Sequence, residues 1–241
     1  MTVGVLREPG TETRVSLLPE AVAQLVKKGI KVLVEKDAGV RSSASDVDYE
    51  KAGAGIVAGP EVLLNSDVLL SISQPGSTTK LEASKVLIGV YAPLFNPGII
   101  ERWAKEKITV FSLDMLPRTT RAQSMDVLSS QANIAGYKAV IHAANIYPRY
   151  FPMFMTAAGS IAPAKVLILG AGVAGLQAIA TARRLGAVVE VFDTRPAVKE
   201  EVMSLGAKFV EVEGAADASK AGGYAVEQTE EYKQKQQQRI S

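Results

Sequence analysis

The 241-residue sequence contains no cysteine and a single histidine, His142. Without cysteine the chain cannot form disulfides, zinc–thiolate sites, iron–sulfur clusters or a thiol nucleophile. With one histidine it cannot build a histidine cluster, so we expect no metal site. A serine–histidine–aspartate triad would have to use His142, which falls late in a predicted helix. There a histidine usually packs or acts as a C-terminal cation.

The sequence also lacks an excess of charge, because 27 lysines and arginines stand against 25 aspartates and glutamates. A net charge of +2 gives no basic footprint, so we expect no nucleic-acid partner. The N-terminal segment has no basic region before an apolar core and does not resemble a signal peptide. The apolar stretch 151–182 is interrupted by Lys165, prolines and glycines, so no membrane-spanning helix is expected there.

Short apolar runs alternate with helix-like patterns through the first 120 residues. The apolar runs predict strands at 3–6, 31–35, 67–72, 85–90 and 108–113. Amphipathic patterns that begin at proline or stop at glycine predict helices at 19–29, 46–54 and 97–107. Such alternation favours a mostly parallel sheet covered on both faces. Residues 1–120 are therefore predicted to form an N-terminal Rossmann-like α/β domain.

A long helix and a connector are predicted at 121–163. Residues 120–145 lack proline and space their apolar side chains three and four apart, which predicts a helix that joins two domains. Residues 146–163 hold three prolines and predict an irregular connector.

A second α/β domain is predicted at 164–241. Its predicted strands are 165–170, 188–193 and 208–212, and its predicted helices are 173–185, 196–205 and 227–240. A doubly wound dinucleotide domain has about six strands, so this domain is predicted to be incomplete. The predicted fold class is α/β, with two Rossmann-like doubly wound parallel-sheet domains joined by a long helix.

A glycine-rich turn separates the strand and the helix that begin this domain. Gly170, Gly172 and Gly175 form the pattern G-A-G-V-A-G. In a dinucleotide fold the first glycine permits the tight turn, the second admits the pyrophosphate and the third lets helix and strand pack closely. The helix N-terminus at Val173 would offer free N–H groups to the phosphates. The alternative is a glycine-rich turn without a ligand.

Asp193 ends the next predicted strand, where a carboxylate accepts hydrogen bonds from the adenosine ribose. Because a carboxylate there repels a 2′-phosphate, NAD(H) is favoured over NADP(H). Arg195 argues the other way, since a nearby arginine can hold a 2′-phosphate. The alternative role of Asp193 is a helix cap before Pro196.

A second polar cluster lies at 117–131, at the start of the long predicted helix. It is dense in hydrogen-bonding side chains. By pattern alone, a solvated N-terminal turn capped by threonine accounts for it as well as a binding loop does.

Two segments resemble the NAD(H)-binding component, domain I of subunit alpha, in the family of proton-translocating NAD(P) transhydrogenases and alanine dehydrogenases. They are RAQSMDVLSSQANIAGYKAV at 121–140 and MTAAGSIAPAKVLILGAGVAGLQAIATARRLGA at 155–187. The opening VGVLREPGTETRVSLLPEAV at 3–22 is similar in both branches of the family. The resemblance covers essentially the whole chain, and RAQSMD is its most specific segment.

This resemblance implies an oxidoreductase and translocase component of the Re/Si-specific type. NAD(H) would be its cofactor, and NADP(H) would be held on a partner component. A membrane-embedded partner would couple hydride transfer to proton translocation. The chain would form a homodimer on the cytoplasmic or matrix-like side, attached peripherally to the inner membrane. The family's later strands and returning helix are absent here, so unaided nucleotide binding is in question.

The resemblance also implies roles for individual residues. Arg118, Gln123 and Asp126 would be catalytic and, with Ser129, would hold the nicotinamide end. The remaining expected cofactor-binding residues are Gly170, Gly172, Val173, Gly175, Asp193, Thr194, Arg195 and, in a mobile loop, Gly223 and Tyr224.

Two other functions stay open. Alanine dehydrogenases move protons on and off a substrate nitrogen, with a lysine in the segment resembling 71–76 and a histidine in that resembling 90–95. Here the first segment has no lysine and the second no histidine. Direct hydride transfer needs only positioning, which favours a transhydrogenase. The alternatives are an alanine-dehydrogenase-like oxidoreductase and a truncated fragment without catalysis of its own.

Overall fold

The computed structural model describes residues 1–75, 81–117, 119–212 and 229–240. The chain folds as two compact units, Met1–Val127 and Leu128–Ser241. The boundary falls at the start of the long helix, inside the segment predicted to join two domains.

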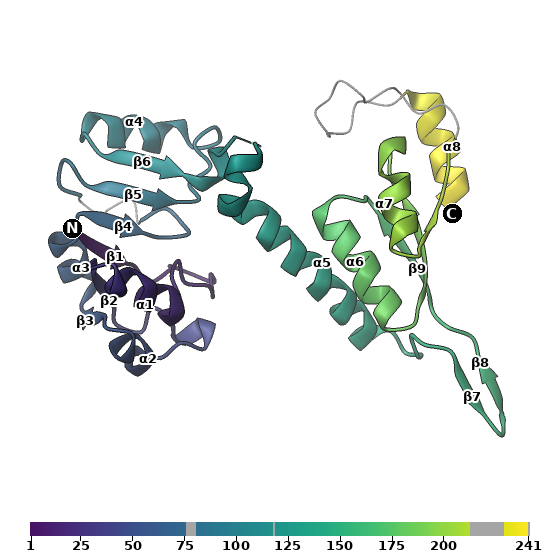
Figure 1. The fold of residues 1–241 in the computed structure, drawn as a ribbon. Coiled ribbons are helices and arrows are strands. Elements are labelled where there is room, and N and C mark those ends of the chain that lie inside the picture. Colours follow the sequence, from purple (N-terminus) through teal and green to yellow (C-terminus); the bar gives the residue numbers. More distant parts are fainter. Residues whose placement is uncertain (76–80, 118, 213–228, 241) are drawn as a thin grey trace. The chain divides into compact units, whose positions relative to one another are not determined.

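The first unit is a six-stranded, wholly parallel sheet with the order β3-β2-β1-β4-β5-β6 (Figure 1). Its strands are β1 (Thr2–Val5), β2 (Lys31–Glu35), β3 (Gly55–Val57), β4 (Val68–Leu70), β5 (Val86–Gly89) and β6 (Thr109–Ser112). This is the strand order of doubly wound dinucleotide-binding domains. The predicted Rossmann-like fold class is confirmed.

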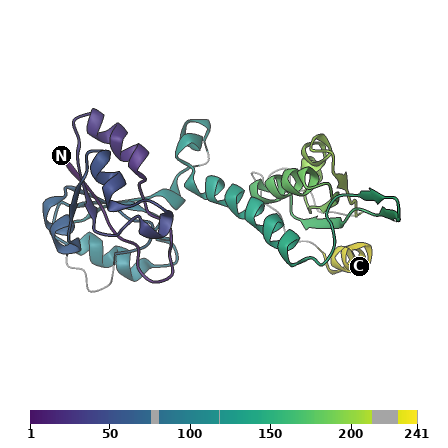
Figure 2. The ribbon, with the colours of Figure 1, turned by 90° about the horizontal axis from the view of Figure 1, so that it is seen from below.

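Helices cover both faces of this sheet (Figures 1 and 2). They are α1 (Pro19–Lys27), α2 (Asp46–Lys51), α3 (Gly59–Asn65) and α4 (Pro97–Lys105), with short 3₁₀ turns η1 (Val40–Ser42), η2 (Leu113–Met115) and η3 (Thr120–Met125). Strand side chains alternate between the faces. Val34 packs into the core with α1 and α2, whereas Leu69 packs with Val62 and Trp103 of α3 and α4.

Residues 55–65 were not predicted to be regular, yet they form β3 and α3. Gly55, Gly59 and Pro60 are typical of loops, and both elements are short. Tertiary packing decides the structure here, because Val62 is completely buried against the sheet.

The second unit holds a three-stranded parallel sheet with the order β11-β10-β9. Its elements are α5 (Val127–Ile146), β7 (Phe154–Thr156), β8 (Gly159–Ile161), β9 (Lys165–Leu169), α6 (Val173–Arg184), β10 (Val188–Phe192), η4 (Pro196–Val198), α7 (Lys199–Ser204), β11 (Lys208–Phe209) and α8 (Glu230–Ile240). The order of these strands repeats that of β3-β2-β1 in the first unit.

Two sequence predictions between the sheets were wrong in detail. The helix predicted at 120–145 is a 3₁₀ turn followed by α5, because Asp126 takes a non-helical ψ of 83°. The connector predicted as irregular contains an antiparallel hairpin of β7 and β8. Prolines at 148, 152 and 163 lie outside these strands, so they do not interrupt the hairpin ladder.

Helix α5 lies alongside α6 (Figures 1 and 2). At Gly136 an added Cβ would come within 2.0 Å of the carbonyl oxygen of Ala174. One turn along, Asn133 donates from Nδ2 to Oε1 of Gln177 at 3.2 Å. Only a residue without a side chain permits this approach. No helix within the described ranges is long and apolar enough to cross a membrane.

We predict that Gly136→Ala destabilises the fold by about 1–3 kcal/mol, the usual cost of forcing atoms into a packed interface. Urea denaturation followed by circular dichroism measures the change. Gly98→Ala in α4 is the matched control, because its new Cβ would meet no atom within 4 Å. Equal stability of the two variants would contradict the close packing of α5 on α6.

Candidate functional site

The glycine-rich turn lies at the carboxyl end of β9, where α6 begins. Gly170 has a φ of +100°, which side-chain-bearing residues rarely adopt, and its N–H donates to the carbonyl of Phe192 at 2.8 Å. At Gly175 a Cβ would lie 1.8 Å from the carbonyl oxygen of Gly170. At Gly172 a Cβ would meet nothing within 4 Å. The fold therefore requires glycine at 170 and 175, while the space beside 172 is open.

Asp193 follows the end of β10 and is 9% exposed. Its Oδ2 accepts a hydrogen bond from the N–H of Ala171 at 2.7 Å, which ties the strand end to the glycine-rich turn. Burial raises the pKa of Asp193. Hydrogen bonds from Arg195 and Ala171 outweigh that effect and hold the pKa below its ordinary value. The side chain is therefore a carboxylate at neutral pH.

Helix α8 closes the same end of β10. Tyr232 is 3% exposed and packs against Phe192 and Val210. Burial, followed by the charge of Asp193, raises the pKa of the Tyr232 phenol. Sequence reasoning did not select Tyr232, although it is the one aromatic residue in an otherwise polar helix.

The predicted site residues fall into three groups. Within the second unit, the ends of β9 and β10 bring together Gly170, Gly172, Val173, Gly175, Asp193, Thr194 and Arg195. Gln123 is exposed in η3 and Asp126 is half-buried just after it, both in the first unit, whereas Ser129 is half-buried in α5. Arg118, Gly223 and Tyr224 lie outside the described residues.

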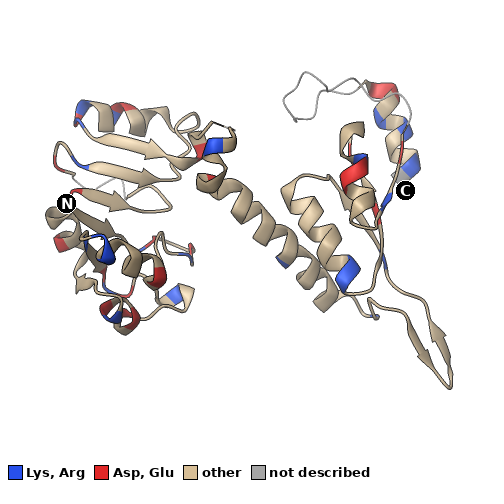
Figure 3. Ribbon diagram, in the orientation of Figure 1, with Lys and Arg blue, Asp and Glu red and all other residues tan. Residues whose placement is uncertain are grey.

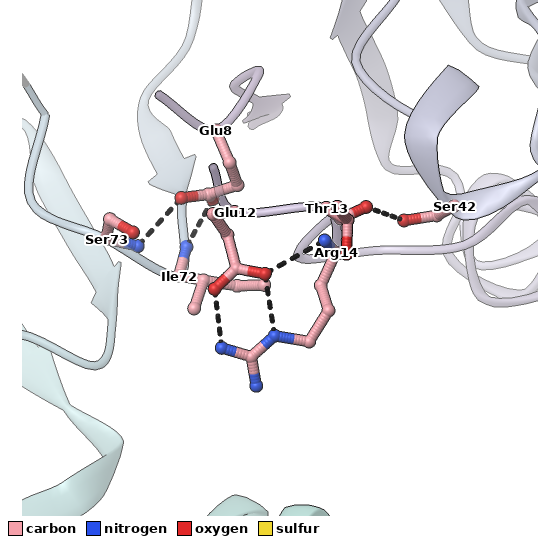
Figure 4. Close-up of polar contacts among 7 residues, drawn as sticks. All are labelled: Glu8, Glu12, Thr13, Arg14, Ser42, Ile72 and Ser73. Carbon is pink, nitrogen blue, oxygen red and sulfur yellow. Dashed lines mark hydrogen bonds and ion pairs between the residues drawn. The ribbon is translucent and has the colours of Figure 1, made fainter. Parts of the chain in front are cut away.

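The first unit has a pocket at the point where its strand order reverses, between β1 and β4. Ligands of open α/β sheets bind in such crevices. The buried Glu8 accepts hydrogen bonds from the N–H groups of Ile72 at 2.5 Å and Ser73 at 2.8 Å (Figure 4). On the other side of the loop after β1, Arg41 donates to the carbonyls of Glu8 and Gly10. This loop is thus fixed at both sides.

Glu12 and Arg14 form a two-point ion pair at the edge of this pocket (Figure 4). Arg14 donates from Nε and Nη2 to the two Glu12 carboxylate oxygens at 2.9 and 2.6 Å. Arg14 lowers the pKa of Glu12 from 4.5 to about 2. A lowered pKa means that the ionised pair stabilises the fold fully above pH 4.5, and that this contribution is lost as the pH falls through about 2.

The pocket beside this pair has a volume of about 480 Å³. Its lining residues are Glu12, Arg14, Ile72, Ser73, Gln74, Val90, Tyr91, Ala92 and Asn96. None of them is a lysine or a histidine. Burial raises the pKa of Tyr91 to about 12, so its phenol stays protonated near neutrality. The pocket can orient a polar ligand, but none of these side chains exchanges protons readily at pH 7.

Sequence reasoning missed this pocket as a site, although it used two of the segments that line it. The available signal was the charged run REPGTETR directly after the first strand, where binding loops of parallel sheets begin.

The chain matches two family profiles. Residues 4–135 match "Alanine dehydrogenase/PNT, N-terminal domain", and residues 139–240 match "Alanine dehydrogenase/PNT, C-terminal domain". Together these ranges cover nearly the whole chain.

Individual relatives are similar over most of its length. An NAD(P) transhydrogenase subunit alpha chain of Rickettsia prowazekii is 46% identical over 234 residues, which cover 94% of this chain and 61% of the relative. The crystal structure of transhydrogenase from Sinorhizobium meliloti is 44% identical with a TM-score of 0.88, and covers 100% of this chain and 66% of that one. An L-alanine dehydrogenase structure is 25% identical with a TM-score of 0.74, covering 87% and 60%. The chain thus spans about three fifths of the curated relative's length.

We predict that Gly175→Ala destabilises the fold by about 1–3 kcal/mol, because its Cβ would overlap the Gly170 carbonyl. Gly172→Ala should leave stability within about 0.5 kcal/mol, because its Cβ enters open space. Chemical denaturation of both variants beside the wild type measures the difference. Similar losses in the two variants would show that the turn does not separate the glycines in this way.

Proposed function

This chain belongs to the alanine dehydrogenase/PNT family, and within it we propose that it is the NAD(H)-binding component of a proton-translocating NAD(P) transhydrogenase. The observation that carries the proposal is the pairing of a dinucleotide turn in one unit with a pocket free of lysine and histidine in the other. The 46% identity to a transhydrogenase subunit supports the same branch of the family.

In this proposal the pyrophosphate of NAD(H) lies beside Gly172, against the N-terminus of α6. Open space at Gly172 and the positive end of the helix dipole suit a dianionic group. Asp193 accepts hydrogen bonds from the adenosine ribose, which disfavours a 2′-phosphate. Val173 and Thr194 border this site. Residues Gly223 and Tyr224 belong to a loop that closes over the nucleotide.

The nicotinamide end of the nucleotide is held by Arg118, Gln123, Asp126 and Ser129 in the same proposal. NADH supplies a hydride from C4 of its ring to C4 of an NADP⁺ ring on a partner component. No proton moves at either carbon, so these side chains act by orienting the ring rather than by acid–base chemistry. The exposure of Gln123 suits a residue that faces a partner-bound nucleotide.

The partners in this proposal are an NADP(H)-binding component and a membrane-embedded component, with this chain peripherally attached on the cytoplasmic or matrix-like side of the inner membrane. A homodimer is also proposed. It is supported by the hairpin of β7 and β8, which carries no charged residue (Figure 3) and exposes Phe154, Met155 and Ile161. Exposed apolar groups of this kind mark protein interfaces.

A second candidate function is an alanine-dehydrogenase-like oxidoreductase that acts on a small amino or keto acid. The pocket beside Arg14 favours it, because an arginine can hold a carboxylate. Against it stands the absence of lysine and histidine among the residues that line that pocket. A third candidate is a non-catalytic fragment or split subunit.

The experiment that separates these functions compares two assays of NADH oxidation. With the partner components and an NADP⁺ analogue, we expect hydride transfer. With pyruvate and ammonia, we expect a rate at least about 100-fold lower, the factor that a missing acid–base group typically costs. The reverse order of rates would favour the amino-acid dehydrogenase, and no reaction in either assay would favour the non-catalytic chain.

We also predict that Gly172→Val weakens NADH binding about 5- to 150-fold while the fold stays intact. The isopropyl group would occupy the space proposed for the pyrophosphate, and such overlap costs about 1–3 kcal/mol. Titration of NADH fluorescence measures affinity, and thermal unfolding measures stability. Gly98→Val is the matched control, because it too enters open space but lies in the other unit. Normal NADH binding by Gly172→Val would exclude this turn as the phosphate site.

A further inference from the structure

The carboxylate of Asp193 has no vacant position for a further hydrogen bond. Oδ1 accepts from the backbone N–H of Arg195 at 2.8 Å and from its Nε at 2.9 Å. Oδ2 accepts from the N–H of Ala171 at 2.7 Å and from Nη2 of Arg195 at 2.9 Å. A carboxylate offers about four acceptor positions, and here four donors fill them.

Two of these donors belong to the backbone and hold the turn and the strand end together. The other two belong to the Arg195 guanidinium, which binds both carboxylate oxygens at once in the strong two-point geometry. A ribose hydroxyl that bonds to Asp193 must therefore replace the guanidinium rather than the backbone. The side chains are 6% exposed for Asp193 and 21% exposed for Arg195, so the guanidinium lies over the carboxylate on the solvent side.

The first unit provides an internal comparison. Glu35 ends β2, and it accepts a hydrogen bond from the N–H of Arg7 at 2.9 Å, just as Asp193 accepts from Ala171. The carboxylate-to-turn bond therefore belongs to the fold. In the first unit, however, the ion-pair contact from Nε of Arg7 to Glu35 is 4.0 Å long. The tight two-point guanidinium is particular to Asp193 and is not needed to build the turn.

We propose that Arg195 is a specificity-determining cover over Asp193, which the ribose of NADH must displace and which binds the 2′-phosphate of NADPH once displaced. This inference rests on the proposed nucleotide site. Competition for Asp193 lowers the affinity for NADH, while the released cation raises the affinity for NADPH. Arg195 thereby narrows the preference for NADH that Asp193 alone would impose.

The surroundings of Arg195 support such a displacement. The charge of Glu201 in α7 acts on the Arg195 guanidinium in addition to that of Asp193. Because Glu201 is exposed, a guanidinium that leaves Asp193 keeps an acidic neighbour while it turns toward solvent. The moving group therefore stays near the ribose, where a 2′-phosphate would lie.

The test measures dissociation constants of NADH and NADPH for the full 241-residue chain by fluorescence titration. In Arg195→Ala we expect NADH to bind about three- to tenfold tighter. This is the gain from removing a cover that is closed for about two thirds to nine tenths of the time. NADPH should bind more weakly than it does to the wild type. Arg195→Lys should also bind NADH more tightly, because it loses the two-point pair, but should retain NADPH binding through its charge.

Arg184→Ala is the matched control, because it removes the same charge at the far end of α6, away from the turn. Unchanged NADH affinity in Arg195→Ala would overturn the cover. Weaker NADH binding would also overturn it, because Arg195 would then hold the nucleotide. If neither the wild type nor Arg195→Ala binds either nucleotide, the proposed site itself fails and the cover with it.

Discussion

The first turn of α6 is held between two backbones at distances that only glycine allows. On the strand side, Gly175 faces the Gly170 carbonyl at 1.8 Å from its absent Cβ; on the helix side, Gly136 of α5 faces Ala174 at 2.0 Å. Everything at this end of the second sheet depends on that double contact. It fixes the position of the helix N-terminus, and with it the N–H groups and the dipole end that make the turn attractive to an anion.

The two units share an architecture but differ in electrostatics. In each, a carboxylate at the end of the second strand accepts the N–H of the turn after the first strand. The turn of the second unit carries glycines and no charge, whereas that of the first carries the buried carboxylate of Glu8 and the Glu12–Arg14 pair. A pyrophosphate would meet negative charge in the first unit and free N–H groups in the second. One fold thus provides a dinucleotide site in the second unit and a polar pocket in the first.

This division suits chemistry that relies on position. Hydride transfer between two nicotinamides demands that two rings be held in contact, with no group that titrates near neutrality. Each unit holds a tight acid–arginine pair, Asp193 with Arg195 and Glu12 with Arg14, and in each pair the pKa of the acid lies below its ordinary value. Such pairs hold geometry and charge constant across the physiological pH range. What changes on binding is which partner an acid has, as Arg195 illustrates.

The sequence by itself determined the elements whose signals are local. The strand 31–35 matches its prediction to the residue, and the glycine turn and Asp193 fall at strand ends as expected, because apolar runs and glycine patterns act over a few neighbours. Only the tertiary structure decided the rest. It made β3 and α3 regular by burying Val62, paired β7 with β8, broke the long helix at Asp126 and aimed Arg195 at Asp193. Those outcomes depend on which atoms meet in space, and a single sequence leaves several partners open to each side chain.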